Sequence, residues 1–441
     1  MKPTKETDRT KETDRFIFGK NACFSSDTSK TGINNNVLVI GCTGSGKTLS
    51  IIEPFLLDMQ NANMILFDPK RVLIEKYRKY HEAKGYTVLE VNLSDPSKGD
   101  IILDPVRYVK SDSDVSALAR ALVSLTPQGK YSSADSYWEN TSCSVFKYAI
   151  HRVLVDRTKA NSIKSVANHI MNMNMKTNEY DISNLPEEES FVNAFKKQQK
   201  NHPMIDAFSS FANVPVKTLS CILSTSQTTV SNVFNEDLLN KYASTKNFNL
   251  KQLTKKKHVI YITTDGQNKY LNNYANLIIE LIMNQLTKYA KEFPEHKLPI
   301  KTNIFCDDFA CGTRIGSFPN QISIFRSMNI SSTVVIQSIS QLFSLYGEHD
   351  ANTIMNNTDT IVYLGGNDIM TASNIALRLN CPTNRVLNMP VGEVIIFRRG
   401  HEATITSRYD TLNDERYQKN IAELNDTKTI RNVQEKTTRM K

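Results

Sequence analysis

Short apolar runs alternate with stretches of helical length along much of the chain, beginning near residue 34. Val37–Ile40 is the first such run and contains no polar residue. Met64–Phe67 and Thr87–Val91 follow it, and segments long enough for helices separate the three. Strands that are apolar throughout are buried on both faces, and intervening helices favour a parallel sheet covered on both sides. The pattern therefore predicts an α/β fold with a mainly parallel central sheet.

This alternation stops near residue 112 and returns only after residue 245. The intervening residues show helical periodicity and no strand pattern. Predicted helices cover Val115–Leu125, Ser136–Val155, Ile163–Met173, Glu187–Gln199 and Thr218–Asn232. Predicted strands resume at His258–Thr263, Thr302–Cys306, Thr333–Ile336, Thr360–Leu364 and Glu393–Phe397. We therefore expect an all-α domain over residues 112–245, inserted into a sheet domain built from residues 32–111 and 246–420.

The two ends of the chain are polar. A TKETDR hexapeptide occurs twice in succession, at Thr4–Arg9 and Thr10–Arg15, and it has no apolar side chain to bury. We predict a polar N-terminal tail over residues 1–31. Residues 421–441 are polar and rich in lysine and arginine. They are predicted to form a basic C-terminal tail.

Composition adds modest constraints. The net charge of +9 is typical of proteins that bind a polyanion, but it is spread over 441 residues. No apolar run approaches the ~18 residues that a membrane-spanning helix needs. The seven cysteines form no CxxC pair and no cluster with histidine at metal-site spacing. Reduced thiols of this kind are typical of the cytoplasm.

The strongest chemical motif is Gly41–Thr48, GCTGSGKT, which fits the phosphate-binding P-loop pattern GxxxxGK(S/T). An apolar strand precedes it and a predicted helix follows, interrupted by Pro54. The glycines let successive backbone N–H groups turn toward phosphate oxygens. We expect the loop residues Gly41, Thr43, Gly44, Ser45, Gly46 and Lys47 to bind a nucleoside triphosphate. Lys47 is expected to reach the β and γ phosphates, and Thr48 to hold Mg²⁺.

A P-loop site also needs a carboxylate on the metal side, at the end of a neighbouring strand. Asp307 and Asp308 follow the predicted strand Thr302–Cys306. We assign Asp307 to the Mg²⁺ and Asp308 to the attacking water. Gln337, after another strand, is a candidate sensor of the γ-phosphate, with a strand-end cap as the alternative. Arg326 is either a surface arginine or an arginine finger that acts on a neighbouring subunit.

Other positions are less specific. Lys70 follows the second strand and either contacts phosphate or a neighbouring subunit, or is merely solvated. The lysine runs at 196–200 and 255–257 either contact a phosphate backbone or form solvated faces. Tyr137 and Trp138 could stack on bases, but a buried core tryptophan is the favoured interpretation.

These motifs together resemble the TraG/TraD-type conjugative coupling proteins, ATPases that link processed DNA to a type IV secretion channel. The resemblance runs from about Gly32 to Tyr417. It is carried by Asn34–Thr48 (NNNVLVIGCTGSGKT), Pro54, Phe67–Lys70 (FDPK), Gly85-Tyr86, Leu103–Tyr108 (LDPVRY), Tyr137-Trp138-Glu139, Cys306–Ala310 (CDDFA), Gln337–Gln341 (QSISQ), Tyr346-Gly347, Leu364-Gly365-Gly366 and Asn388-Met389-Pro390.

The resemblance implies a RecA-like motor domain of the FtsK/HerA type with a small all-helical domain. It also implies a homo-hexameric ring with ATP between subunits and DNA, expected to be single-stranded, in a central channel. A chain in isolation could be monomeric. The implied partners are a relaxase within its relaxosome and the membrane proteins of the secretion channel.

Three departures from the family pattern stand out. The family usually carries two membrane helices before the motor domain, whereas no such run occurs here. We favour a cytoplasmic member that a partner recruits to the inner face of the membrane; the alternative is a chain from which the N-terminal membrane helices have been removed. Asp308 stands where the family usually has glutamate, and Arg71 stands where it often has glycine.

The sequence thus predicts an ATP-dependent coupling protein that drives relaxase-bound DNA into a secretion channel. Two alternatives stay open. One is a nucleotide-binding substrate receptor with little hydrolysis, because Asp308 is one methylene shorter than glutamate. The other is a double-stranded DNA translocase for segregation.

Overall fold

The computed structural model describes residues 14–125, 135–156, 158, 160–175, 185–309 and 314–426. Two compact units account for them. The sheet unit contains the residues up to Glu90, Leu250–Asp265 and the residues from Ile282 onward. The helical unit contains Val91–Asn249 and Gly266–Leu281. The helical unit thus begins before residue 112 and has a second segment, both outside the predicted insertion of 112–245.

Within the described residues, nine strands form the central sheet in the order β11-β10-β9-β3-β8-β7-β4-β6-β5. The strands from β9 to β6 in this order are mutually parallel, and β10 and β11 are antiparallel at one edge. Their bounds are β3 Val37–Ile40, β4 Asn63–Asp68, β5 Thr87–Asn92, β6 His258–Thr263, β7 Thr302–Cys306, β8 Ile330–Ile336, β9 Thr360–Tyr363, β10 Glu393–Arg398 and β11 Thr404–Ser407. The predicted mainly parallel α/β sheet is confirmed.

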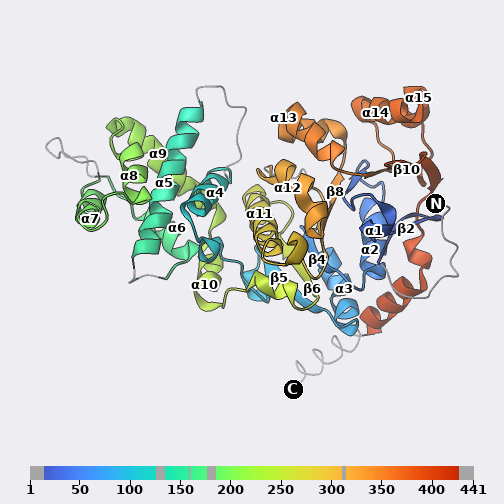
Figure 1. Ribbon diagram of the computed structural model, residues 1–441, viewed down its shortest axis with the longest axis horizontal. Helices are drawn as coiled ribbons and strands as arrows, with labels where there is room; N and C mark the ends of the chain where they lie inside the picture. The colour runs from blue at the N-terminus through green and yellow to red at the C-terminus, as the bar shows by residue number, and fades with distance from the viewer. Residues whose placement is uncertain are drawn as a thin grey trace, which may run out of the picture. The chain divides into compact units, whose positions relative to one another are not determined.

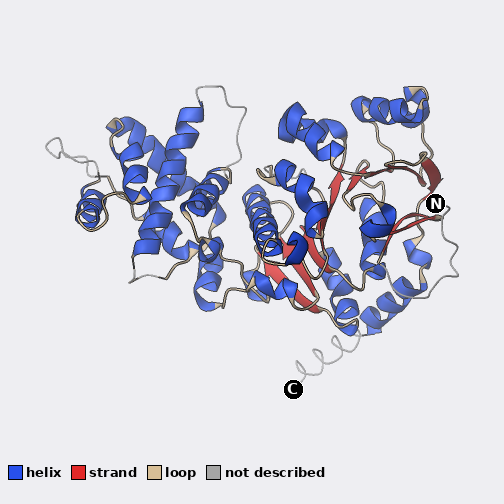
Figure 2. Cartoon of the chain, viewed as in Figure 1, coloured by secondary structure: helices blue, strands red, loops and turns tan. Residues whose placement is uncertain are grey.

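The central strands are buried along their whole length, and their sequences are largely apolar, with the buried Ser331, Ser332 and Thr333 of β8 among the exceptions. Leu38 of β3 pairs with Val334 of β8 on one side and with Ile361 of β9 on the other. Figures 1 and 2 show helices on both sides of these strands. Since parallel strands end at the same edge, the loops after β3, β7 and β8 lie close together.

The helices of the sheet unit are mostly short. They are α1 Thr28–Thr31, the π-helical turn η1 Thr48–Ile52, α2 Glu53–Asp58, α3 Val72–Ala83, α12 Phe318–Ile324, α13 Ile339–Asn356, α14 Ile369–Leu379, α15 Thr383–Leu387 and a helix over 415–426. Short 3-10 turns are η4 Leu250–Thr254, η5 Pro294–His296, η6 Phe325–Met328 and η7 Thr411–Asn413. The helix α11 Lys269–Ala290 belongs in part to each unit.

The helical unit is built around α5, which packs against α4, α6, α8 and α9. Its helices are α4 Asp112–Val123, α5 Asp135–Val155, α6 Ile163–Met171, α7 Pro186–Lys196, α8 Pro203–Ala212, α9 Val216–Val233 and α10 Glu236–Ser244, preceded by the 3-10 turns η2 Pro96–Lys98 and η3 Pro105–Tyr108. Sequence periodicity predicts neither α8 nor α10. Both are short, so the apolar period repeats over too few turns to stand out.

The predicted polar tail over residues 1–31 is wrong for its second half. The strands β1 Arg15–Gly19 and β2 Ala22–Ser25 form an antiparallel hairpin. The Phe16 and Phe18 rings are buried against Phe55 of α2, with centroids 5.1 and 5.5 Å away. Burial of these aromatic rings stabilises an ordered segment, which a polar leader could not do. Residues 1–13, including most of the duplication, lie outside the described residues.

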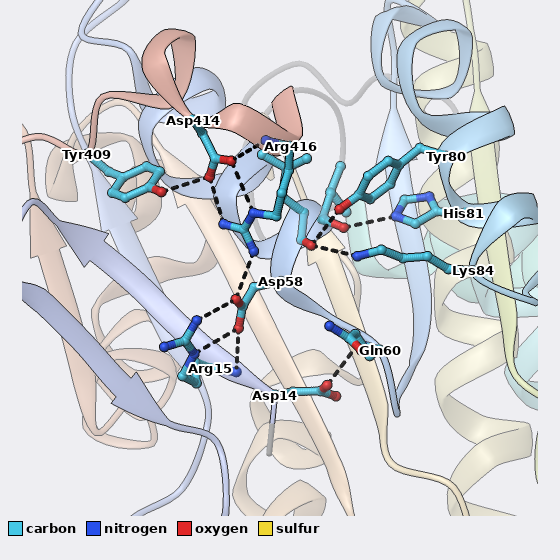
Figure 3. Close-up of polar contacts among 12 residues, drawn as sticks. Asp14, Arg15, Asp58, Gln60, Tyr80, His81, Lys84, Tyr409, Asp414 and Arg416 are labelled. Carbon is cyan, nitrogen blue, oxygen red and sulfur yellow. Dashed lines mark hydrogen bonds and ion pairs between the residues drawn. The ribbon is translucent and has the colours of Figure 1, made fainter. Parts of the chain in front are cut away.

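Both ends of the described chain reach Asp58 at the end of α2 (Figure 3). The Arg15 guanidinium donates to Asp58 Oδ1 at 2.9 Å, and Arg416 Nη1 donates to the same oxygen at 3.0 Å. Arg416 lies in the helix over 415–426, so the predicted basic tail from residue 421 continues a helix for its first six residues. Residues 427–441 lie outside the described residues. Among the described residues, no helix is long and apolar enough to cross a bilayer.

Candidate functional site

The Gly41–Thr48 loop leaves the carboxyl end of β3 and is tied to both neighbouring strands. Gly41 N–H donates to the Ile336 carbonyl at the end of β8, at 3.2 Å. Cys42 N–H donates to the Gly365 carbonyl just after β9, at 3.0 Å. Gly44 and Gly46 have φ angles of 77° and 80°, in the left-handed region that glycine adopts without strain. Hydrogen bonds to the sheet therefore hold the loop backbone in its curved conformation.

Lys47 is buried, and its ammonium lies over the loop. Nζ donates to the Gly41 carbonyl at 2.7 Å and to the Cys42 carbonyl at 3.0 Å. The Ser45 hydroxyl is buried and has no hydrogen-bond partner among the described residues. An ammonium group and an unsatisfied hydroxyl facing a curled backbone suit the oxygens of a phosphate chain. The loop thus fits the group that its motif predicts.

Thr48 and Asp307 meet at the head of this loop. The Thr48 hydroxyl donates to Asp307 Oδ2 at 2.8 Å, although the residues are far apart in sequence. Asp307 follows β7, the next strand after β8 in the sheet. Burial raises the pKa of the Asp307 carboxyl, and the Thr48 hydrogen bond and the Lys47 charge only partly offset this. A hydroxyl and a carboxylate held together are oxygen ligands of the kind that Mg²⁺ prefers.

Asp308 continues from Asp307 in a left-handed turn. Its φ is 54°, a conformation that aspartate tolerates better than most residues. Its N–H donates to Asp307 Oδ1 at 3.1 Å, and the next residue, Phe309, donates its N–H to the Val335 carbonyl of β8 at 3.0 Å. The turn is therefore fixed against β8, and it places both carboxylates at the carboxyl edge of the sheet.

Gln337 also lies at this edge, directly after β8, with an exposed side chain. Its N–H donates to Gln341 Oε1 at 3.0 Å. Arg326 does not lie there. It precedes β8, so it lies at the opposite edge of the sheet, where Nη2 donates to the Gly32 carbonyl at 2.9 Å. The structure thus brings Gln337 to the same sheet edge as the loop, while Arg326 lies away from the loop of its own chain.

The segment after β4 explains one departure from the family pattern. Asp68 caps α3, accepting from Val72 N–H at 3.1 Å and Ile74 N–H at 3.0 Å, and burial raises its pKa to about 6. Arg71 has a φ of 59°, a backbone position that glycine usually takes. Its guanidinium is held by the buried Glu90 at 2.8 and 3.0 Å. These ion pairs help arginine adopt this conformation, and Lys70 beside it is exposed.

The aromatic pair on α5 differs from expectation. Trp138 is 42% exposed and Tyr137 is 50% exposed, so the predicted buried core tryptophan is wrong. Both residues belong to the first half of α5, whose apolar contacts are made by residues further along. In the lysine runs, Lys196, Lys197 and Lys200 are exposed. Lys257 instead donates to the Gln60 carbonyl at 2.7 Å, so it supports the sheet unit.

Two further residues contact the loop and its helix without any sequence signal. Arg408 follows β11 and donates from Nη2 to the Leu364 carbonyl at 3.2 Å. A Cβ on Gly46 would lie 3.3 Å from its Nη1. The Thr411 hydroxyl donates to the Leu49 carbonyl at 2.5 Å. Neither residue belongs to a motif. Both reach the P-loop and its helix because the chain turns back toward them after the edge strand β11.

Comparisons with known proteins identify a matching family and structures with a similar fold. The family model for type IV secretory system conjugative DNA transfer matches residues 2–386. A search of curated proteins found no match. Among solved structures, the bacterial conjugative coupling protein TrwBdeltaN70 in a trigonal form with sulphate has a TM-score of 0.66 at 14% identity, with 91% of this chain and 90% of that chain covered.

Two further structures are similar over the same share of this chain, 91%. TrwB in complex with the ATP analogue ADPNP has a TM-score of 0.66 at 14% identity, with 90% of that chain covered. VirB4 of Thermoanaerobacter pseudethanolicus has a TM-score of 0.55 at 11% identity, with 97% covered. At these identities the structural likeness shows the fold. Because the family model spans most of the sequence, the chain belongs to the type IV secretory system conjugative DNA transfer family.

Proposed function

We propose that this chain is an ATP-dependent coupling protein of conjugation, which uses ATP hydrolysis to move relaxase-bound DNA into a type IV secretion channel. The observation that carries the proposal is the contact between Thr48 and Asp307 at the head of the P-loop. Solved TrwB structures contain ADPNP, or ADP with Mg²⁺, which supports ATP and Mg²⁺ as the ligands here.

Each residue of the site has a distinct part in the proposed reaction. Bound Mg²⁺ supplies positive charge to the phosphate oxygens. Lys47 moves its ammonium from the loop carbonyls to the β and γ phosphates, and the N–H groups of Gly44, Ser45 and Gly46 bind phosphate. Thr48 and Asp307 hold the metal. Asp308 orients the attacking water and takes its proton, and Gln337 contacts the γ-phosphate.

Arg326 is proposed to act on the ATP of a neighbouring subunit. Its place at the opposite edge of the sheet supports action between subunits rather than within one. A homo-hexameric ring would bring this edge of one subunit toward the P-loop of the next. The guanidinium would then leave the Gly32 carbonyl and stabilise the charge that develops during phosphoryl transfer.

The proposed DNA contact includes the exposed aromatic pair of α5. Tyr137 and Trp138 form an edge-to-face pair with ring centroids 6.1 Å apart, and both rings are accessible. Base stacking on such rings is tolerant of sequence, as a transfer motor requires. We further propose that the protein works at the inner face of the cell membrane, recruited there by channel proteins, and receives the relaxase with its DNA.

A Lys47→Ala variant tests the motor role in a conjugation assay. Transfer should fall to the level of a strain without the gene, because the charge that binds the β and γ phosphates is lost. Lys79→Ala, which removes an exposed lysine of α3, serves as the matched control and should retain normal transfer. Normal transfer by Lys47→Ala at normal protein level would refute the motor role.

The shorter Asp308 side chain favours one second candidate, a nucleotide-binding receptor that barely hydrolyses ATP. Turnover measured with and without DNA separates the two functions. A motor should be stimulated by DNA, and stronger stimulation by single strands than by duplexes would exclude a segregation translocase. Tight ATP binding with turnover that DNA leaves unchanged would favour the receptor. An Asp308→Glu variant that gains turnover would show that side-chain length sets the rate.

A further inference from the structure

The helix that follows the P-loop has an irregular first turn. In the π-helical turn η1, Glu53 N–H donates to the Thr48 carbonyl, five residues back instead of four. The next residue is Pro54, which has no N–H. In an α or π register, the donor to the Leu49 carbonyl would be residue 53 or residue 54. Because Glu53 donates to Thr48 and Pro54 has no N–H, neither register gives this half-buried carbonyl a donor of its own.

Thr411 supplies that donor from the far end of the chain. Its side-chain hydroxyl donates to the Leu49 carbonyl at 2.5 Å. Thr411 is only 1% exposed, so water does not readily replace this bond. The residue lies in the turn η7, shortly after the edge strand β11.

The same segment contacts both ends of the P-loop helix. At the start of the helix, Arg408 lies against Gly46 and donates to the Leu364 carbonyl. At the end of the helix, Arg416 donates to Asp58 at 3.0 Å, and Asp414 holds the Arg416 guanidinium at 2.7 Å (Figure 3). We call residues 408–416 the C-terminal strap. It follows the helix from Gly46 to Asp58.

We propose that the strap fixes the π register of the first turn, and that Thr411 is a positioning residue for the nucleotide site. Leu49 directly follows Thr48, so a change of register at Leu49 would shift the Thr48 hydroxyl relative to Asp307. Single π turns inside helices occur frequently at functional sites. The link to nucleotide rests on the function proposed above, whereas the link to helix register does not.

The test begins with Thr411→Val, which keeps the shape of the side chain and removes the hydroxyl. Two measurements are made on the full chain: amide hydrogen exchange of residues 49–58 without nucleotide, and affinity for a fluorescent ATP analogue with Mg²⁺. Exchange should become faster, and affinity should fall about fivefold, the effect of one lost hydrogen bond. Thr411→Ser keeps a hydroxyl and should behave like the wild type. Thr404→Val, on the exposed face of β11, is the matched control.

A second variant distinguishes positioning from general support. Pro54→Ala restores an N–H at residue 54, which can donate to the Leu49 carbonyl. In the Thr411→Val background it should recover at least half of the lost protection and affinity. A strap that merely stabilised the fold would give no such recovery.

Unchanged exchange in Thr411→Val, or no recovery in the double variant, would overturn the proposal. Failure of the wild type to bind the analogue would instead refute the proposed function. The exchange measurement would then still decide whether the strap sets the helix register.

Discussion

Each unit of the molecule holds a half-buried acidic side chain among charged and polar neighbours, and the two sites differ in which effect sets the pKa. In the helical unit, burial raises the pKa of Glu188, but His169, Tyr148 and Arg152 outweigh it, and the pKa lies below its ordinary value. In the sheet unit, burial prevails at Asp307 and the pKa is raised. The neighbours of Glu188 thus outweigh the effect of burial on its pKa, whereas Thr48 and Lys47 do not outweigh it at Asp307.

A raised pKa alone does not mark a ligand site. Burial also raises the pKa of Asp104 in the helical unit, to about 7, yet its oxygens accept from the backbone N–H groups of Val106 and Ile163. Those partners belong to helix starts and cannot move away. The Asp307 oxygen facing the loop instead accepts from the Thr48 hydroxyl, a rotatable group that can itself bind a metal. The proposed role of Asp307 in metal binding thus rests on its contact with Thr48 and not on its raised pKa.

The largest expected effect is at Asp307. Asp307→Asn keeps the shape but removes the charge that would hold Mg²⁺. Hydrolysis of ATP should fall by about a thousandfold, because metal-assisted charge stabilisation is worth several kcal/mol. The rate is measured with saturating DNA. Glu188→Gln, the matched change in the helical unit, should retain the rate within about threefold. Equal losses of rate in the two variants would show that Asp307 has no special role in hydrolysis.

The next effect is a pH dependence of the sheet unit. Burial lowers the pKa of His81 to about 4, and its Nε2 lies 3.0 Å from the Leu56 carbonyl (Figure 3). The folded chain therefore keeps His81 neutral between about pH 6.5 and pH 4, while the unfolded chain takes up a proton. Stability should fall as pH falls through this window, by up to about 3 kcal/mol at about 1.4 kcal/mol per pH unit.

Urea unfolding at pH 7 and pH 5 measures this loss in the wild type and in His81→Gln. The glutamine amide can replace the Nε2–H donor and does not titrate. The variant should lose less stability on acidification. Asp68 works in the opposite direction, since its pKa is raised to about 6. An equal loss in both chains would show that His81 does not control the pH dependence.

A smaller effect is expected from Glu188 itself. Glu188→Ala would leave the buried Tyr148 hydroxyl without its acidic acceptor, while Arg152 would keep its ion pair with Asp156. The helical unit should lose about 2 kcal/mol of stability, in the range for a broken buried polar cluster. Thermal unfolding followed by hydrogen exchange would assign the loss to this unit. An unchanged affinity for ATP would support a purely structural role for Glu188, in contrast to Asp307. A strong loss of affinity for ATP would contradict that contrast.

The smallest effect concerns Trp138. Trp138→Ala removes a partly exposed ring, so stability should change by less than about 0.5 kcal/mol. Affinity for a single-stranded oligonucleotide should fall about fivefold or more, because stacking on one aromatic ring is worth about 1–3 kcal/mol per base. Trp138→Phe should retain most of the affinity. Unaltered affinity in Trp138→Ala would remove this residue from the proposed DNA contact.

Much of the sheet could be predicted, because strands buried on both faces leave a continuous apolar signature. The predicted strands Val37–Ile40, His258–Thr263 and Thr302–Cys306 match β3, β6 and β7 at both ends. The P-loop and the carboxylates after β7 could be predicted because strand topology brings them to one edge. Their chemical roles remain proposals.

Other features depend on contacts between distant segments and left no local signal. The hairpin β1–β2 is too short to show periodicity, and its order comes from packing on Phe55. The helix begins with a π turn just before Pro54, and the distant Thr411 donates a hydrogen bond to the Leu49 carbonyl in that turn. Tryptophan is a residue type typical of protein cores, yet Trp138 lies near the start of α5 and is exposed.

The convergence of Arg15 and Arg416 on Asp58 has a consequence for synthesis on the ribosome. The chain emerges from its N-terminus, so the hairpin and the P-loop helix exist long before residue 416 does. Until then Asp58 has only one of its two arginines, and the Leu49 carbonyl lacks Thr411. The sheet unit can reach its final form only after residue 416 has been synthesised. The sheet unit of a nascent chain should therefore acquire protease resistance only once residue 416 has left the ribosome.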